Sequence, residues 1–325
     1  MRNSLLHAGY DKLNSLLDAF IEKKSFSKIL KNKAENIDYK RRNKFFVNIK
    51  ILFLFAHANL IWRRYIKNKI KRLKKEKELY EILEKKGCFR DLKVNIYLFR
   101  IIWREICKHV NGKYDDGVAA NFAFATLLYD VSFDLSEFNK YLSDFNGFIY
   151  DEEPVNEKDE FLKLFKESVD FVQNKVSKTT FDKLMEYVRI LHVIQLLNSN
   201  RFPNQKRINN DVFKVSYAKG GISCLAIICL FGSVVDEIKK NALYEFGAAV
   251  QLMDDLFDID KDLKTGMITI PNQGLLKPDE IIKIYYGSIN CLINKFGINT
   301  NSTNIMLEML NRLADEIIVH QKSKK

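Results

Sequence analysis

The sequence predicts an all-α protein. Glycine and proline, which interrupt helices, are scarce, with 13 and 4 residues among 325. Apolar residues recur at spacings of three and four through most of the chain, which is the pattern of amphipathic helices. The short alternating runs that indicate strands hardly occur. A chain of this length can bury a sizeable core, and we expect a single helical domain at residues 41–325, preceded by an N-terminal helical extension at residues 1–40.

Each expected helix is a stretch of this periodicity between two breaks. The breaks are expected at glycine, proline or acidic turn signals, namely Gly87, Asn111-Gly112, Asp151 to Pro154, Arg201 to Pro203 and Thr269 to Pro278. The bundle of about ten or more helices that results covers, in order, residues 4–24, 43–85, 92–110, 116–134, 157–173, 178–198, 211–231, 234–262, 278–296 and 302–321.

The most apolar stretch is residues 51–62, which lies between Lys50 and Arg63. Its 12 residues are too few to cross a bilayer, which takes about 20, so we expect no transmembrane segment. The first residues also lack the long apolar core of a signal peptide. Residues 63–86 interleave charged and aliphatic side chains and are expected to form one amphipathic helix.

Positive charge is concentrated in the first 90 residues, which hold 24 Lys or Arg and 9 Asp or Glu, a net +15. The whole chain carries +12, so residues 91–325 carry about −3. A basic segment of this kind is a solvated helical face, a surface that approaches an anionic membrane, or a nucleic-acid site. We favour the solvated face, keep peripheral membrane contact as the alternative, and expect no nucleic-acid partner.

The five cysteines form no CxxC pair, and Cys224 and Cys229 lie in an apolar helical run, where free cysteine packs as a small hydrophobe. A reduced, cytoplasmic location is therefore expected, with membrane-peripheral placement left open. A homodimer is also left open.

An acidic ladder lies in the expected helix at residues 234–262. Asp254, Asp258 and Asp262 are each four residues apart, so they fall within roughly 80° of one another on the helix. Asp255 lies about 60° from Asp258, at the edge of that face, and we give it less weight. Stacked like charges destabilise a helix unless something compensates, and Mg²⁺ prefers carboxylate and phosphate oxygens. We favour a magnesium site; the alternative is an ordinary exposed acidic face.

A second acidic pair ends the apolar segment from Ala119 to Phe133. Asp130 and Asp134 are one turn apart there, and Tyr129 and Phe133 lie beside them. Two such helices facing each other would form a cavity with acids at its mouth and aromatic residues within reach. The alternative is that these aromatic residues belong to the core.

These residues resemble the class I isoprenoid synthase superfamily. The segment from Gly247 to Pro271 is similar to its second aspartate-rich motif, because Gln251 and the following acids match QxxDDxxD. The four-residue ladder to Asp262 is similar to the (N/D)xxxDxxxD of the squalene and phytoene synthases and of the tetraprenyl-β-curcumene-synthase type of terpene synthase. Met267 and Thr269 stand where the squalene and phytoene pattern has Arg and Tyr.

Two earlier segments extend the resemblance. Asp130 to Asp134 resembles the first motif in its DxxxD form, without the DDxxD and paired arginines of chain-elongating enzymes, which counts against elongation. Tyr217 to Ser223 looks like the helix break that precedes the second motif. There Lys219 is carried over as a contact to the diphosphate; a surface lysine at a turn is the alternative.

The resemblance implies an isoprenoid synthase fold, which is a helical bundle around a central apolar cavity, and a Mg²⁺-dependent reaction on a prenyl diphosphate. The implied metal ligands are Asp130, Asp134, Asp254, Asp258 and Asp262, the first four of which are also the implied catalytic residues. The implied substrate contacts are Lys219, Gln251, Tyr129 and Phe133.

Three functions remain open at this point. A terpene synthase that cyclises or eliminates from one prenyl diphosphate is favoured. A prenyltransferase that couples prenyl diphosphates is the second. A non-catalytic helical protein associated with membranes is the third.

Overall fold

The structure is a computed structural model that describes residues 54, 56–151, 154, 156–198, 212–232, 235–298 and 305–323. All regular elements in this part of the chain are helices, and no strand occurs in it, which confirms the all-α class. Contacts between residues divide the chain into two compact units, described separately below: unit 1 comprises Met1–Arg42, Glu186–Ile227 and Val235–Lys325, and unit 2 comprises Asn43–Met185 and Ile228–Val234. The extension at residues 1–40 lies outside the described residues, and the single domain at 41–325 and the central cavity stay predictions.

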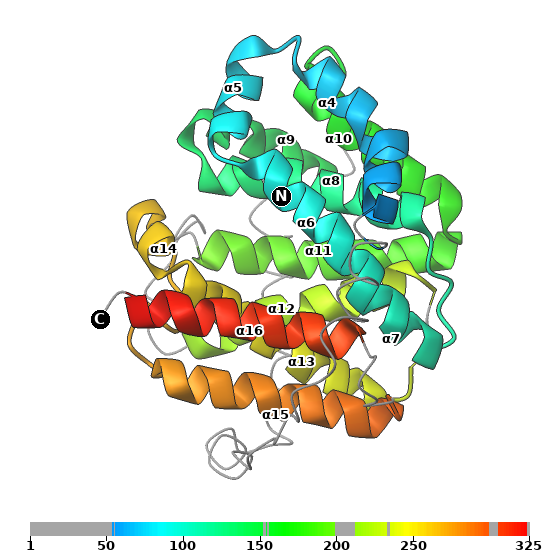
Figure 1. The fold of residues 1–325 in the computed structure, drawn as a ribbon. Coiled ribbons are helices and arrows are strands. Elements are labelled where there is room, and N and C mark those ends of the chain that lie inside the picture. The colour runs from blue at the N-terminus through cyan, green and yellow to red at the C-terminus, as the bar shows by residue number, and fades with distance from the viewer. Residues whose placement is uncertain are drawn as a thin grey trace. The chain divides into compact units, whose positions relative to one another are not determined.

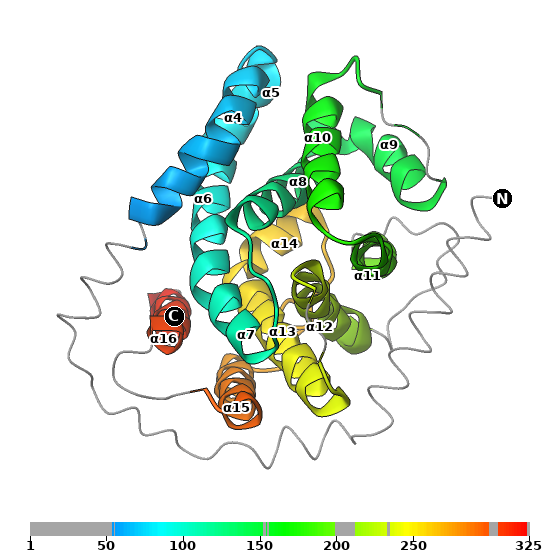
Figure 2. The same cartoon turned by 90° about the vertical axis from the view of Figure 1, so that its right-hand side faces the viewer.

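The described part of unit 2 opens in a helix that includes residues 56–61 and passes through a π-helical turn, η1 (Trp62–Ile66), into α4 (Lys67–Leu73). After α5 (Lys77–Lys85), Gly87 adopts a left-handed conformation (φ 77°) and turns the chain into α6 (Cys88–Leu98). The helices α5 and α6 are in contact, and Figure 2 shows α6 running on from there toward α7. The remaining elements of this unit are η2 (Phe99–Trp103), α7 (Arg104–His109), α8 (Asp116–Asp134), η3 (Ser136–Tyr141), α9 (Leu142–Asn146), η4 (Gly147–Asp151) and α10 (Glu160–Lys175).

The central helix of unit 2 is α8, and its sequence determines both of its ends. The Asp115 carboxylate caps the first turn by accepting a hydrogen bond from the Val118 backbone N–H at 2.8 Å. Leu135 is extended and ends the helix. Between these ends α8 is almost wholly buried, and it packs against α10 through an aliphatic and aromatic core that includes Phe124, Leu128 and Phe161.

Unit 1 contains α13 (Glu237–Phe257), α14 (Ile259–Thr265), α15 (Pro278–Phe296) and α16 (Ile305–Ser323). The helices α11 (Lys178–Asn198) and α12 (Val212–Leu230) have residues in both units. In Figure 1, α13, α15 and α16 lie side by side, and α13 packs against both of the others. Pro278 begins α15, where the Glu280 carboxylate accepts from the Lys277 N–H at 2.8 Å, and Gly297 ends it in a left-handed conformation.

Three expected helices, at residues 116–134, 178–198 and 278–296, coincide with α8, α11 and α15. Two other expectations were wrong. The expected helix at 43–85, and the single amphipathic helix at 63–86 within it, is interrupted between Lys74 and Glu76. The expected helix at 234–262 is interrupted at Asp258. Like charges crowd both interruptions, and neither contains the glycine or proline that would mark it in the sequence.

The sequence analysis also left residues 136–151 without a helix, although η3, α9 and η4 fill this segment. Phe138, Tyr141 and Phe145 are all buried there. Their spacing of three and four is itself a helical pattern, so this segment was open to prediction.

In the described part of the chain, no single helix is long and apolar enough to cross a membrane. The bent pair formed by Asp116–Asp134 and Ser136–Tyr150, with an angle of 110° between its parts, passes the same length and composition test only when the two are taken together.

Candidate functional site

The acidic ladder survives the break between α13 and α14. The Asp258 N–H donates to the Asp254 carbonyl at 2.9 Å, and the Asp262 N–H donates to the Asp258 carbonyl at the same distance. These are the i to i+4 bonds of an α-helix, so the three acids still follow one another at intervals of one turn. Asp254 is exposed and the other two are partly exposed. The ladder is therefore open to solvent and to a ligand.

Asp255, to which the sequence analysis gave less weight, is the most enclosed acid of this cluster. It is 5% exposed, and its Oδ1 accepts a hydrogen bond from Gln251 Nε2 at 2.7 Å. The same Gln251 nitrogen lies 3.4 Å from Asp254 Oδ2. Gln251 therefore links the buried acid to the exposed ladder. The spacing of four residues between Gln251 and Asp255 is the signal in the sequence that could have indicated this pair.

Burial and mutual repulsion weaken the acidity of this cluster. Burial raises the pKa of the Asp255 carboxyl to about 7, although nearby Lys219 opposes the shift. Burial, followed by the charge of Asp258, raises the pKa of Asp262 to about 7, again opposed by Lys219. At neutral pH these two carboxyls are therefore partly protonated, and a cation placed among them would favour their ionised form.

Lys219 reaches this cluster because α12 and α13 approach each other closely. A Cβ atom built on Gly220 would lie 2.2 Å from the Gly247 carbonyl oxygen, and one built on Gly247 would lie 2.3 Å from the Gly220 carbonyl oxygen. Only glycine allows this approach. Lys219 precedes the first of these glycines, so the crossing brings its charge near the acids of α13 and α14.

The expected helix break at Tyr217 to Ser223 does not occur, because α12 runs without interruption from Val212 to Leu230. The glycines of this segment serve the close packing of two helices. Gly221 has the same role, since a Cβ atom there would lie 2.5 Å from the ring of Tyr244. The alternative placement of Lys219 at a surface turn is therefore wrong as well, since the residue is helical and partly buried.

Asp130 and Asp134 belong to unit 2, in the last turn of α8, and both are partly exposed. Tyr129 packs against two aromatic neighbours, tilted against Phe133 with ring centroids 5.2 Å apart and edge-on against Phe145 with ring centroids 5.6 Å apart. Phe133 is 2% exposed. Both aromatic residues thus take part in the packing of unit 2, and their role as substrate contacts stays a prediction.

The chemistry of the ladder fits Mg²⁺, although the side chains do not close around a single point. In the described ranges, no group of three or more His, Cys, Asp or Glu side chains is arranged to hold a metal ion. Magnesium needs no such cage, since one or two carboxylates usually hold it together with waters and substrate phosphates. Asp254, Asp258 and Asp262 offer hard oxygen donors of this kind on a partly exposed surface.

No protein-family model matches the chain, and no curated protein and no solved structure is significantly similar to it.

Proposed function

We propose that the chain is a Mg²⁺-dependent class I terpene synthase, which ionises an allylic prenyl diphosphate, cyclises it or eliminates a proton from it, and releases diphosphate. The observation that supports this most is the partly exposed ladder of Asp254, Asp258 and Asp262 with Lys219 beside it. Carboxylates next to a lysine suit a metal-bound diphosphate, because the acids attract the cation and the lysine attracts the phosphate oxygens.

Each residue has a distinct part in this proposal. Asp254, Asp258 and Asp262 would hold Mg²⁺, and the resemblance assigns Asp130 and Asp134 to the same task. The metal, when bound, supplies positive charge that stabilises the departing diphosphate. Lys219 contacts the diphosphate oxygens, and Gln251 holds Asp255 and Asp254 in place through its amide nitrogen. Tyr129 and Phe133 would face the hydrocarbon, where aromatic rings stabilise cationic carbon.

A prenyltransferase that couples a prenyl diphosphate to a second one, or to another acceptor, is the second candidate. It would use the same acids and the same lysine, because both reactions begin with loss of diphosphate. The lack of DDxxD and paired arginines at Asp130 to Asp134 counts against a chain-elongating form of this candidate. Met267 and Thr269, in place of the Arg and Tyr of the squalene and phytoene pattern, count against its head-to-head form.

Incubation with farnesyl, geranylgeranyl and geranylfarnesyl diphosphates and Mg²⁺, followed by mass spectrometry, tests the proposal. A terpene synthase converts one substrate into a hydrocarbon or an alcohol, whereas a prenyltransferase gives a coupled product. Asp258→Asn should lose most of this activity. Asp260→Asn, which changes an exposed acid of the same segment, is the matched control and should retain it.

The third candidate, a non-catalytic helical protein, makes the opposite prediction. Mg²⁺ with inorganic diphosphate would then leave the melting temperature unchanged, and Asp258→Asn would behave like the unmodified protein. Product formation from none of the three substrates, together with no stabilisation by Mg²⁺ and diphosphate, would refute the enzyme proposal.

A further inference from the structure

Seven exposed cationic side chains lie along the first helices of unit 2, and we call this set the basic stripe. Its members lie in η1, in α4, in the turn that follows and at the start of α5, within a segment of 15 residues: Arg63, Arg64, Lys67, Lys71, Lys74, Lys75 and Lys77. From Arg63 to Lys75 this segment contains no Asp or Glu, and Glu76 is the first acid. No acidic residue of this segment therefore lies between the first six cations of the stripe.

The buried side of the same helix determines that the basic stripe faces outward. Ile66, Ile70 and Leu73 are between 0 and 9% exposed and belong to the core of unit 2. Because these aliphatic residues face inward, Lys67 and Lys71 are held on the outer surface. The apolar face of this helix is already occupied and is not free to insert into lipid.

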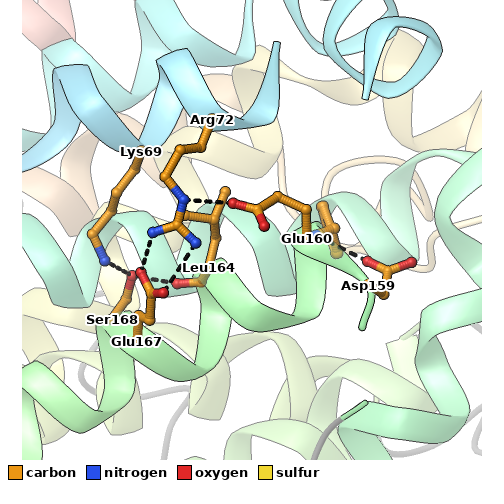
Figure 3. A network of polar contacts seen from close by, with 8 residues as sticks. Lys69, Arg72, Asp159, Glu160, Leu164, Glu167 and Ser168 are labelled. Carbon is orange, nitrogen blue, oxygen red and sulfur yellow. Dashed lines mark hydrogen bonds and ion pairs between the residues drawn. The ribbon is translucent and has the colours of Figure 1, made fainter. Parts of the chain in front are cut away.

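Two further cations of α4 differ from the stripe because they are bound to α10. Arg72 lies 2.5 Å from Glu160 and 2.7 Å from Glu167, and Lys69 donates to Ser168 Oγ at 2.6 Å. Figure 3 shows Lys69 and Arg72 reaching from α4 onto α10. These contacts hold α4 against the unit, so the stripe is presented on a fixed scaffold.

We propose that the basic stripe adsorbs the protein onto the surface of an anionic lipid bilayer. Cations near such a surface attract its negative headgroups at distances up to about the Debye length. The first four members of the stripe follow the outer side of a continuous helix from Arg63 to Leu73, about 16 Å long at 1.5 Å per residue, and the other three follow directly after its end. Such an arrangement suits a flat surface that it can touch along its length. Lipid headgroups diffuse within the bilayer and can therefore contact cations at any spacing. The negative charges need not be arranged in advance to match the positions of the lysines and arginines.

Nucleic acid fits the same charges less well. Proteins that bind single strands combine a basic groove with exposed aromatic rings on which the bases stack. The aromatic rings next to the stripe are partly buried and already have partners. Tyr65 packs edge-on against Phe171 with ring centroids 5.9 Å apart. Tyr80, which lies under Lys74, stacks on Phe89 with ring centroids 5.3 Å apart. A helix that enters a duplex groove needs more free surface than α4 has, since α4 packs against α10.

Sedimentation with lipid vesicles tests this inference, which does not depend on the proposed reaction. The full chain should bind vesicles of phosphatidylcholine mixed with phosphatidylglycerol at low salt, and should not bind vesicles of phosphatidylcholine alone. Binding should be lost at about 1 M salt, where the Debye length falls to about 3 Å. Replacing Lys67, Lys71 and Lys75 together by Gln should lower partitioning about 100-fold, since each lysine near the surface contributes roughly a fivefold factor.

The matched control replaces three exposed lysines elsewhere, Lys158, Lys178 and Lys183, by Gln, which changes the net charge by the same amount. This control should bind vesicles nearly as well as the unmodified protein, and both variants should melt within a few degrees of it. The inference is overturned if the unmodified chain does not bind anionic vesicles at low salt, or if the two triple variants lose binding equally. Tighter binding to duplex DNA or single-stranded RNA than to the vesicles would overturn it as well.

Discussion

Gly220 of α12 and Gly247 of α13 lie in backbone contact. The carbonyl oxygen of each glycine lies within 2.3 Å of the position that a Cβ atom on the other glycine would take. A side chain on either glycine would therefore have to displace main-chain atoms. A Cβ on Gly247 would also lie 2.4 Å from the Cβ of Cys224. This crossing brings Lys219 near the acidic ladder, so the stability of unit 1 and the proposed site depend on the same two residues.

Replacing Gly247 by Ala should destabilise the protein by about 1–3 kcal/mol, because the added methyl group has no space unless the helices separate. A thermal melt measures the loss. Val250→Ala, on the more exposed side of the same helix, should cost less than about 1 kcal/mol. Equal melting temperatures for the two variants would show that the helices can move apart without cost.

His192 leads to a prediction about acid stability. Its side chain is 0% exposed, and burial lowers its pKa to about 3 from an ordinary value of 6.5. Between these two pH values the unfolded chain binds a proton that the folded chain does not, so stability falls as the pH falls. From pH 6.5 to pH 5 this histidine should remove up to about 2 kcal/mol of stability.

Melting temperatures of the unmodified protein and of His192→Gln, recorded across that range, measure this contribution. The variant should show a shallower decline, because glutamine does not titrate. His109→Gln, at a histidine that is 27% exposed, is the control for the substitution itself. Parallel curves for the unmodified protein and His192→Gln would contradict the assignment.

Arg72 should stabilise the contact between α4 and α10. Its guanidinium donates to both carboxylate oxygens of Glu167, at 2.7 and 3.0 Å, and to Glu160 at 2.5 Å (Figure 3). The three side chains are 22 to 37% exposed, which limits the contribution through solvent screening. Arg72→Ala should therefore cost about 1–2 kcal/mol.

Arg72→Lys should recover less than half of that loss, because lysine cannot form the forked contact to Glu167. Lys71→Ala is the matched control, since Lys71 is an exposed neighbour on the same helix. Denaturant melts of the three variants compare them. A loss no larger for Arg72→Ala than for Lys71→Ala would show that this ion-pair network adds nothing to stability.

The best-predicted helices are those with sequence signals at their ends. The helices α8 and α15 were predicted from periodicity after the breaks at Asn111-Gly112 and at Thr269 to Pro278, and the structure shows that residue type marks their ends as well: Asp115 caps α8, and Gly297 follows the last residue of α15. The break at Asp258 carries no such signal. It falls within a run of acids whose mutual repulsion the sequence does indicate, but the spacing of the acids does not show at which residue the helix breaks.

Tertiary packing explains what the sequence analysis of the site missed. Helical periodicity predicted a helix at residues 211–231, as the structure has it, but the family resemblance led to the interpretation of Tyr217 to Ser223 as a helix break. In the structure Gly220 and Gly221 let α13 approach instead. Asp255 received less weight because it lies at the edge of the ladder face. Its burial depends on how closely neighbouring helices pack, and helical periodicity alone does not show this.

Lys219 should bind diphosphate. Its charge opposes the raised pKa values of Asp255 and Asp262, so its side chain lies within electrostatic range of the ladder. Loss of a hydrogen bond to a charged group costs about 1.5–3 kcal/mol, which corresponds to about 10- to 100-fold in affinity. Lys219→Met should weaken binding of inorganic diphosphate by this factor at saturating Mg²⁺, and Lys219→Arg should restore part of it, because arginine keeps the charge.

Calorimetric titration with diphosphate measures both variants. Lys264→Met removes an exposed lysine of α14 close in sequence to the same acids, and it should leave the affinity within about twofold. Equal losses for Lys219→Met and Lys264→Met would mean that only the overall charge near the ladder matters. An unchanged affinity of Lys219→Met for diphosphate would show that this lysine is not part of the site. The assignment of the site would then rest on the acids alone.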